Sequence, residues 1–328
     1  MSTIKKILLG VAGVFVLLLA LKFVADFRYF HEYDPSTPFN VKVESVEDRD
    51  AYQRVKFSFD SIPGEPIPTL LTLPKVRAGR VPCVIFLHGI GQKKDFLDEI
   101  TTPFNEAGFA MACFDQYMQG ERKLDTKNPL AQLIAFRRRA ASTVNDTRRL
   151  VDYLQQHPDI DPDRIYMVGA SYGAITGSTA TALEPRIKAT VLVYGGAGIS
   201  NLLEARLIKQ EVGAWLTPLK MFANFVLWPA DPIRYAGKIA PRPVLLQNGK
   251  DDGLISTAAA EALQNAVQEP KKITWYEGDH IGMDEATVRT VLDEGLQWIK
   301  EQDARVTAEL RGTQKATVAG NLTPAAAH

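Results

Sequence analysis

The sequence predicts an α/β fold built on one mostly parallel sheet, with antiparallel strands at its N-terminal edge. From Val81 onward, short apolar runs alternate with longer helical stretches, which is typical of a parallel sheet covered on both faces. Before this point, three strand-like segments follow one another across short polar or Pro- and Gly-containing turns, which favours antiparallel pairing. These segments are Val41–Val46, Tyr52–Phe59 and Ile67–Leu73.

The parallel part is predicted from the period of its apolar residues and from the turn residues between them. The predicted strands are Val81–Leu87, Phe109–Phe114, Ile165–Ala170, Ile187–Val193, Pro243–Gln247 and Ile273–Tyr276. The predicted helices are Phe96–Ala107, Leu130–Gln156, Tyr172–Leu183 and Val288–Ile299. The connection between the strands that end at Val193 and begin at Pro243 exceeds an ordinary crossover, so an inserted helical cap is expected at about residues 196–238. The alternative is a packed helix pair without a functional role.

The N-terminal segment has a different character. Lys5 and Lys6 precede an apolar stretch from Ile7 to Ala25 that is interrupted by Lys22, and its length is close to the roughly 20 residues that cross a bilayer. It lacks a good small-x-small cleavage site, which favours an uncleaved signal anchor over a signal peptide. The two lysines then place the following domain on the extracytoplasmic side. Secretion after cleavage is the alternative.

Composition narrows the class of protein further. The chain is 46% apolar and 23% charged, as in an ordinary globular protein, and its 38 basic side chains balance 38 acidic ones. This balance gives no indication of a nucleic-acid partner. Cys83 and Cys113 lie in strand-like runs and are expected to be buried, with a disulfide between them left open. No metal-type Cys/His spacing is present, so no metal is expected.

The chain is organised around Gly169-Ala170-Ser171-Tyr172-Gly173. An apolar strand leads into this motif and a helix is predicted to follow, which puts Ser171 at a sharp strand-to-helix turn. A serine in the strained backbone of such a turn needs small neighbours, and a glycine stands two positions away on each side. The Tyr172 N–H at the helix start is then available to a negatively charged oxygen.

A serine hydroxyl needs a base, and the base needs a group that fixes its orientation. Two adjacent carboxylates, Asp251 and Asp252, follow the strand Pro243–Gln247. Among the five histidines, His280 is the one that follows a strand downstream of the serine and the acids. Serine, acid and histidine in this order after successive strands predict a catalytic triad.

The strand that ends at Leu87 opens into His88-Gly89-Ile90-Gly91. Its backbone N–H groups, that of Ile90 in particular, are expected to supply the second half of an oxyanion hole beside Tyr172. His88 is expected to be structural, with its ring hydrogen-bonded beneath the loop.

The Arg137-Arg138-Arg139 run falls on a predicted helix. Its three side chains would point in different directions, so a solvated face is expected. Binding of anionic lipid or of a carboxylate is the alternative.

Together these motifs resemble the α/β-hydrolases, and most of all their dienelactone-hydrolase and prolyl-oligopeptidase-like branch, over about residues 50–300. The supporting segments are His88-Gly89, Ile160-Asp161-Pro162-Asp163-Arg164-Ile165 before the elbow, Asp115 to Arg122, and Gly249-x-x-Asp252-x-x-Ile255. The resemblance implies an α/β-hydrolase domain in which Asp252 is the acid, with Asp251 as the alternative, and Ser171 and His280 complete the triad.

The chain also departs from both groups. Dienelactone hydrolases proper use a cysteine nucleophile, whereas this chain has a serine. Prolyl-oligopeptidase-type peptidases carry a large propeller, and the short stretch before Val81 leaves no room for one. The resemblance therefore implies hydrolysis of small carboxylic esters through an acyl-enzyme, a reaction that implies no cofactor. A peptidase or amidase with the same machinery and an inactive membrane-tethered scaffold are the alternatives.

The expected organisation has five parts. They are a membrane anchor (1–30), a linker (31–40), an α/β-hydrolase domain (41–302) that contains the cap insertion (196–238), and an Ala/Thr/Gly-rich tail (303–328) whose composition predicts disorder. The expected partners are a small-molecule ester and, through the N-terminal helix, a membrane.

Overall fold

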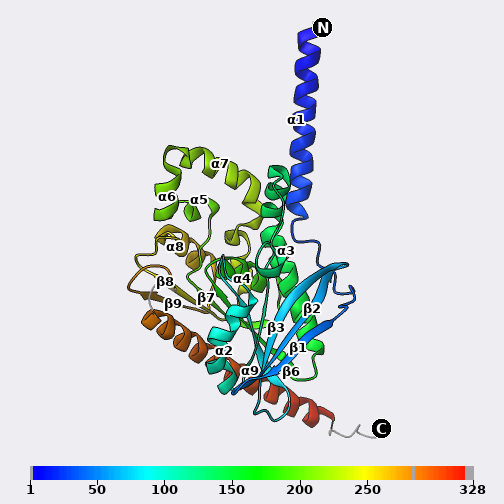
Figure 1. The fold of residues 1–328 in the computed structure, drawn as a ribbon, viewed down its shortest axis with the longest axis vertical. Coiled ribbons are helices and arrows are strands. Elements are labelled where there is room, and N and C mark those ends of the chain that lie inside the picture. Colours follow the sequence, from blue (N-terminus) through cyan, green and yellow to red (C-terminus); the bar gives the residue numbers. More distant parts are fainter. Residues whose placement is uncertain (1–2, 282–284, 322–328) are drawn as a thin grey trace, which may run out of the picture.

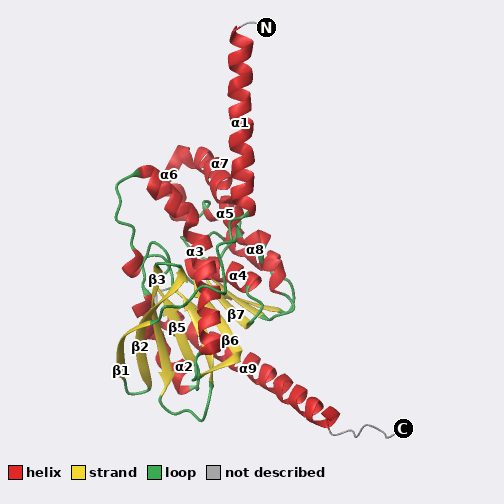
Figure 2. Cartoon of the chain, turned by 90° about the vertical axis from the view of Figure 1, so that its right-hand side faces the viewer, coloured by secondary structure: helices red, strands yellow, loops and turns green. Residues whose placement is uncertain are grey.

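The computed structural model describes residues 3–281 and 285–321, which form one nine-stranded sheet between two layers of helices, with a long helix projecting from one end (Figure 1, Figure 2). The strands are β1 (Lys42–Asp48), β2 (Tyr52–Ile62), β3 (Glu65–Pro74), β4 (Val81–Leu87), β5 (Ala110–Phe114), β6 (Ile160–Ala170), β7 (Ile187–Val193), β8 (Val244–Gly249) and β9 (Lys271–Tyr276). The α-helices are α1 (Thr3–Phe27), α2 (Leu97–Glu106), α3 (Pro129–Gln156), α4 (Tyr172–Leu183), α5 (Ile199–Leu202), α6 (Arg206–Val212), α7 (Leu216–Leu227), α8 (Thr257–Ala266) and α9 (Glu285–Asn321).

The sheet has the order β1-β2-β3-β5-β4-β6-β7-β8-β9. The pairs β1–β2, β2–β3 and β3–β5 are antiparallel, and the pairs from β5–β4 to β8–β9 are parallel. The predicted fold class is thus confirmed. The strand order changes direction on either side of β4, where open parallel sheets place their ligands.

Helices cover the two faces of the sheet unequally. On one face α3 packs against Ile85 and Leu87, and α4 and α8 pack against side chains of β7 and β8. On the other face α2 and α9 pack in the cluster that contains Val84 and Phe86. Both faces of β4 and β5 are therefore dry, which explains why these two strands are apolar at every position rather than at alternate ones.

The cysteines occupy neighbouring strands but different faces. Cys83 on β4 belongs to the core beneath α3, and Cys113 on β5 belongs to the core beneath α2. Both are buried and free. The disulfide that the sequence left open is therefore not formed.

The N-terminal helix α1 is long and apolar enough to cross a membrane, and its apolar stretch is exposed along its whole length. The segment predicted as a linker, residues 31–40, is fixed to α3. Buried Arg149 donates to the carbonyl oxygens of Pro35 at 3.2 Å and Thr37 at 2.6 Å, and Tyr33 donates to Asp152 at 2.9 Å. This segment therefore packs as part of the domain surface.

Residues between β7 and β8 fold into short helices, α5, α6 and α7, that lie at the same end of the molecule as α1 (Figure 1). This is the region in which the sequence predicts a helical insertion.

The prediction of a disordered tail from residue 303 is wrong up to Asn321, because α9 continues to that residue. Asp303 accepts hydrogen bonds from Arg164 at 2.6 and 2.8 Å and from Tyr166 at 2.7 Å, and these bonds hold the helix to β6. Beyond this anchor the Ala- and Glu-containing sequence has adequate helix propensity. Residues 322–328 of the predicted tail lie outside the described residues.

Candidate active site

Ser171 occupies the turn between β6 and α4 with φ 54° and ψ −116°, a backbone conformation that is strained for a residue with a side chain. Its N–H donates to the Val193 carbonyl oxygen at 2.8 Å. A Cβ on Gly169 would lie 2.3 Å from the Gly173 oxygen, and a Cβ on Gly173 would lie 1.9 Å from the Leu87 oxygen. Only glycine fits at these two positions, and their close packing holds the serine at the apex.

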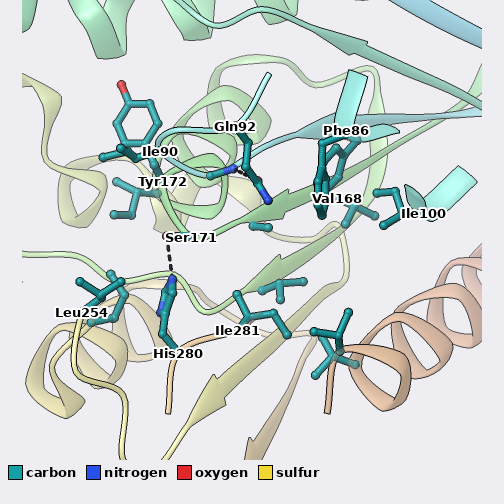
Figure 3. A pocket seen from close by; sticks show the side chains of 18 of the residues that line it. Phe86, Ile90, Gln92, Ile100, Val168, Ser171, Tyr172, Leu254, His280 and Ile281 are labelled. Carbon is teal, nitrogen blue, oxygen red and sulfur yellow. Dashed lines mark hydrogen bonds between the residues drawn. The ribbon is translucent and has the colours of Figure 1, made fainter. Parts of the chain in front are cut away.

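The ends of three strands bring Ser171, Asp252 and His280 together, and Figure 3 shows Ser171 and His280 of this group. His280 Nε2 lies 3.0 Å from Ser171 Oγ, and His280 Nδ1 lies 2.8 Å from Asp252 Oδ2. The side chains of His280 and Asp252 are 10% and 3% exposed. One ring nitrogen is thus placed to accept the serine proton while the other donates to the carboxylate.

Of the two candidate acids, Asp252 is the one that contacts His280. Its second oxygen, Oδ1, accepts from the N–H groups of Leu254 at 2.8 Å and Ile255 at 2.9 Å, which fixes the carboxylate plane. Asp251 is exposed, and its N–H donates to the Gly278 carbonyl oxygen.

Asp279 is a residue that sequence reasoning did not single out. Its Oδ1 accepts from the N–H groups of Gly253 and His280, both at 2.7 Å, and its Oδ2 accepts from Arg206 of α6 at 2.9 Å. These hydrogen bonds, that from Gly253 foremost, hold the pKa of the Asp279 carboxyl below its usual value. Asp279 therefore joins the loops of Asp252 and His280 to each other and to the insertion.

Tyr194, at the end of β7, was also missed. It is buried with φ 53°, and its ring meets the His280 ring edge-on at 5.7 Å between centroids. Burial, with the nearby Asp252 charge, raises the pKa of Tyr194 to about 12, so the phenol stays neutral beside the acid–histidine pair. The ring limits how far the imidazole can turn.

The loop after β4 lies against Ser171, since a Cβ on Gly89 would be 3.5 Å from the serine Cβ. Side-chain oxygens of Gln92 and Gln119 accept from the N–H groups of Gly89 at 2.9 Å and Gly91 at 2.8 Å. These two bonds fix the loop on either side of Ile90.

Within residues 3–281 and 285–321, neither of the predicted oxyanion donors, the N–H groups of Ile90 and Tyr172, donates to another protein group. Both residues line the cavity at Ser171. The two donors are therefore available to a bound oxygen atom.

His88 is fully buried beneath this loop, as the sequence predicts. Its Nδ1 lies 2.9 Å from the Gly89 carbonyl oxygen, and its own carbonyl oxygen accepts from Gln116 at 2.6 Å. Burial lowers the pKa of His88 and keeps its ring neutral. Among the described residues, no group of His, Cys, Asp and Glu side chains is arranged to hold a metal ion.

A cavity of about 480 Å³ opens at Ser171 and His280 and extends between the sheet and the helices α2 and α9 (Figure 3). Apart from Gln92, Tyr172 and the Ser171–His280 pair, its lining side chains are aliphatic or aromatic. Those deepest in the core are Phe86, Ile100, Val168 and Val291. Ile208 of α6 is the one described residue of the insertion that lines it.

The arginine run on α3 is not the solvated face that the sequence suggested. Arg137 pairs with Asp26 of α1 at 2.6 Å, and Arg138 pairs with Glu65 at 3.1 Å. Arg139 stacks on the ring of Tyr172 with 4.4 Å to its centroid. Each points in its own direction, as expected on a helix, but each meets a partner from a distant part of the chain.

The sheet order and the strand-to-helix turn at Ser171 are those of the α/β-hydrolase fold. The sequence matches the Dienelactone hydrolase family over residues 67–285, and the chain belongs to this family. The protein is therefore a hydrolase by family, as the resemblance implied.

Relatives agree with this placement. YtaP of Bacillus subtilis (strain 168) is 24% identical over 257 residues, which cover 73% of this chain and 83% of that protein. The esterase YjfP of Escherichia coli (strain K12) is 24% identical over 193 residues, 58% of this chain and 76% of that protein. Acetyl xylan esterase 1 from Thermoanaerobacterium sp. has the same fold, with a TM-score of 0.68 at 20% identity, and covers 86% of this chain and 93% of its own.

Proposed function

We propose that this protein hydrolyses carboxylic esters through an acyl-enzyme on Ser171. The observation that carries the proposal is the unbroken hydrogen-bonded series from Ser171 Oγ through His280 to Asp252. A bare serine hydroxyl is a weak nucleophile, and a base at 3.0 Å from its oxygen is what activates it.

In the proposed reaction, His280 takes the Ser171 proton as Oγ attacks the ester carbonyl carbon. Asp252 orients the ring and stabilises the imidazolium that forms. The N–H groups of Tyr172 and Ile90 donate to the oxyanion of the tetrahedral intermediate. His280 then returns the proton to the leaving alcohol, and in the second half-reaction it activates the water that releases the acid.

The cavity supports an uncharged, apolar acyl group as the preferred part of the substrate. A carboxylate or an ammonium group placed among Phe86, Val168 and Val291 would lose its hydration without gaining a partner, which is costly. An ester hydrolase is also favoured by the relatives whose names describe esterases.

We further propose that α1 is an uncleaved signal anchor and that the helices of residues 196–238 act as a cap. The anchor is supported by the length and exposure of α1 and by the packing of residues 26–37 on the domain. The cap is supported by Ile208, which lines the cavity.

The test is turnover by the full chain in detergent micelles, with p-nitrophenyl esters and aminoacyl p-nitroanilides as substrates. Ser171→Ala is expected to lower kcat for esters by at least about 10³-fold, because the nucleophile is removed. Ser36→Ala, at an exposed position, serves as the matched control and should retain full activity.

Two outcomes separate the alternatives. Ser171-dependent cleavage of the anilides at a rate comparable with the esters would favour a peptidase. Failure of the folded wild-type chain to react with a fluorophosphonate at Ser171 would favour an inactive scaffold and contradict the proposed function.

A further inference from the structure

The base of α1 is attached to two different elements of the domain. Arg137 of α3 donates to Asp26 at 2.6 Å and also to the carbonyl oxygen of Val226 in α7. Lys22 lies over the ring of Phe225 with 4.4 Å to its centroid. The side chain of Asp26 is only 6% exposed, so this junction is a packed contact. The last turns of α1 and helix α7 therefore stand at the same level.

A second contact fixes the direction in which α1 leaves the domain. The buried ring of Tyr29 donates through its hydroxyl to the Arg137 carbonyl oxygen, and Phe30 meets Tyr235 edge-on at 5.2 Å. The residues that follow α1 therefore contact α3 and the end of the insertion, and the last turns of α1 itself contact α7. The helix is thus held to one end of the molecule rather than joined by a free linker (Figure 1, Figure 2).

Large apolar side chains are exposed on the elements that surround this base. We call them the collar: Trp215, Phe222, Phe225 and Trp228 in and beside α7, and Leu130 and Ile134 in the first turns of α3. Trp215 is 74% exposed and the other five are each between 48% and 64% exposed. Scattered apolar residues are ordinary on a soluble surface, but several of them on two neighbouring elements at one end of the molecule are typical of an interaction site.

We propose that the collar lies in the headgroup layer of the membrane that holds α1. The inference rests on the proposed anchor role of α1. If α1 crosses a bilayer, the level of Lys22 and Asp26 is the membrane surface. Phe225 lies at this level because it contacts Lys22, and the helix α7 that carries it lies beside the lower part of α1 (Figure 1). Tryptophan rings are enriched at this depth, where one part of the ring meets lipid and its N–H meets water. In this arrangement the domain contacts the bilayer through α1, α7 and the first turns of α3, and not through α1 alone.

The tryptophans of the chain provide both the probe and its control. Trp215 and Trp228 belong to the collar, whereas Trp275 lies on β9 and Trp298 on α9, which runs along the end opposite α1 (Figure 1). Four full-length variants, each with one tryptophan and phenylalanine at the other three positions, are reconstituted in phosphatidylcholine–phosphatidylglycerol vesicles. The vesicles contain lipids with a nitroxide at the headgroup or deep in the acyl chain.

We expect the headgroup nitroxide to reduce the fluorescence of Trp215 and Trp228 by about half, because collar side chains would lie within the interface. Trp275 and Trp298 should be unaffected by it. Aqueous acrylamide, measured in parallel, should quench Trp215 less in vesicles than in detergent-free buffer containing an amphipathic polymer.

Three outcomes would overturn the inference, and they are distinguishable. Extraction of the chain by alkaline carbonate would show that α1 is not inserted, so the anchor proposal itself fails. Carbonate-resistant protein with equal quenching of all four tryptophans would leave the anchor standing and refute the collar. Protection of Trp215 from acrylamide without nitroxide quenching would assign the collar to contact with a second copy of the chain.

Discussion

At the scale of single residues, the Asp279 carboxylate holds the loops of Asp252 and His280 together by hydrogen bonds, as the Asp252 carboxylate holds the His280 ring. One carboxylate oxygen accepts from the N–H groups of both Gly253 and His280, so the loops that carry Asp252 and His280 share an acceptor. The other oxygen reaches Arg206. Asp279 does not line the cavity, and its contacts lead us to expect that it positions the loops of Asp252 and His280.

We predict that Asp279→Ala lowers kcat for esters roughly tenfold with little change in KM, since His280 would lose its fixed orientation toward Ser171. Asp279→Asn keeps a side-chain oxygen for the two N–H groups and should restore most of the rate. Steady-state kinetics of both variants, with Asp251→Ala as the exposed neighbour control, make the comparison. A loss confined to KM, or an equal loss in Asp251→Ala, would contradict the positioning role.

Whether a residue of the site could be predicted depends on whether neighbouring residues in the sequence, or contacts between distant residues, give it its place. The turn at Ser171 could be predicted because five adjacent residues specify it, and the proximity of His280 to Ser171 because it was the one histidine in the required order. Their catalytic roles stay predictions. Asp279 and Tyr194 could not be predicted, since their significance comes from Gly253, Arg206 and the His280 ring, which only the folded chain brings near. The oxyanion role of Ile90 stays a prediction.

At the scale of elements, α9 is held to the edge of the sheet by one carboxylate. Glu294 accepts from Lys272 at 2.7 Å, Thr274 at 3.0 Å and Gln247 at 3.2 Å, and from the Tyr276 hydroxyl. Burial alone would raise its pKa, but the hydrogen bonds from Lys272 and Tyr276 outweigh this and lower the pKa of Glu294 to about 2.

A carboxylate whose pKa falls on folding stabilises the protein above its unfolded pKa of 4.5, and this contribution disappears as the pH drops toward 2. We predict that Glu294→Gln lowers the free energy of unfolding at pH 7 by about 1–2 kcal/mol, discounted for partial exposure. The difference from the wild type should shrink as the pH falls below 4.5. Denaturant titration at several pH values measures this, with exposed Glu301→Gln as control. A pH-independent difference would contradict it.

Most elements could be predicted because each carries its own period: Val81–Leu87, Tyr172–Leu183 and Ile187–Val193 were placed at their observed bounds. The extent of α9 could not, because the composition beyond Gln302 resembles a disordered tail. Asp303 of α9 instead pairs with Arg164 and Tyr166 of strand β6, which are far from it in the sequence.

At the scale of the whole molecule, the helical layer formed by α2 and α9 does not fill all the space above the sheet. The sheet, α2 and α9 leave the cavity of about 480 Å³ between them, and its inner end is lined by Ile100 and Val291 from the two helices. A substrate whose acyl chain fills this space would bury one methylene after another against apolar side chains.

We predict that kcat/KM for p-nitrophenyl esters rises about fourfold with each added methylene until the cavity is full, because burial of a methylene is worth about 0.8 kcal/mol. Val291→Phe should narrow the inner end and shift the optimum to shorter chains while leaving acetyl-ester turnover within about twofold. Rates measured across a chain-length series for both proteins test this. An unchanged optimum in Val291→Phe would show that the acyl group binds elsewhere.

The separation of Cys83 and Cys113 by the sheet has a consequence for where this chain can fold. Burial raises the pKa of both thiols, and the thiolate is the form that oxidants and disulfides attack. Because the two side chains belong to cores on opposite faces of the sheet, they do not form a disulfide with each other in the fold. The domain therefore acquires the same covalent structure in an oxidising compartment as in a reducing one, and its maturation is independent of any thiol oxidase.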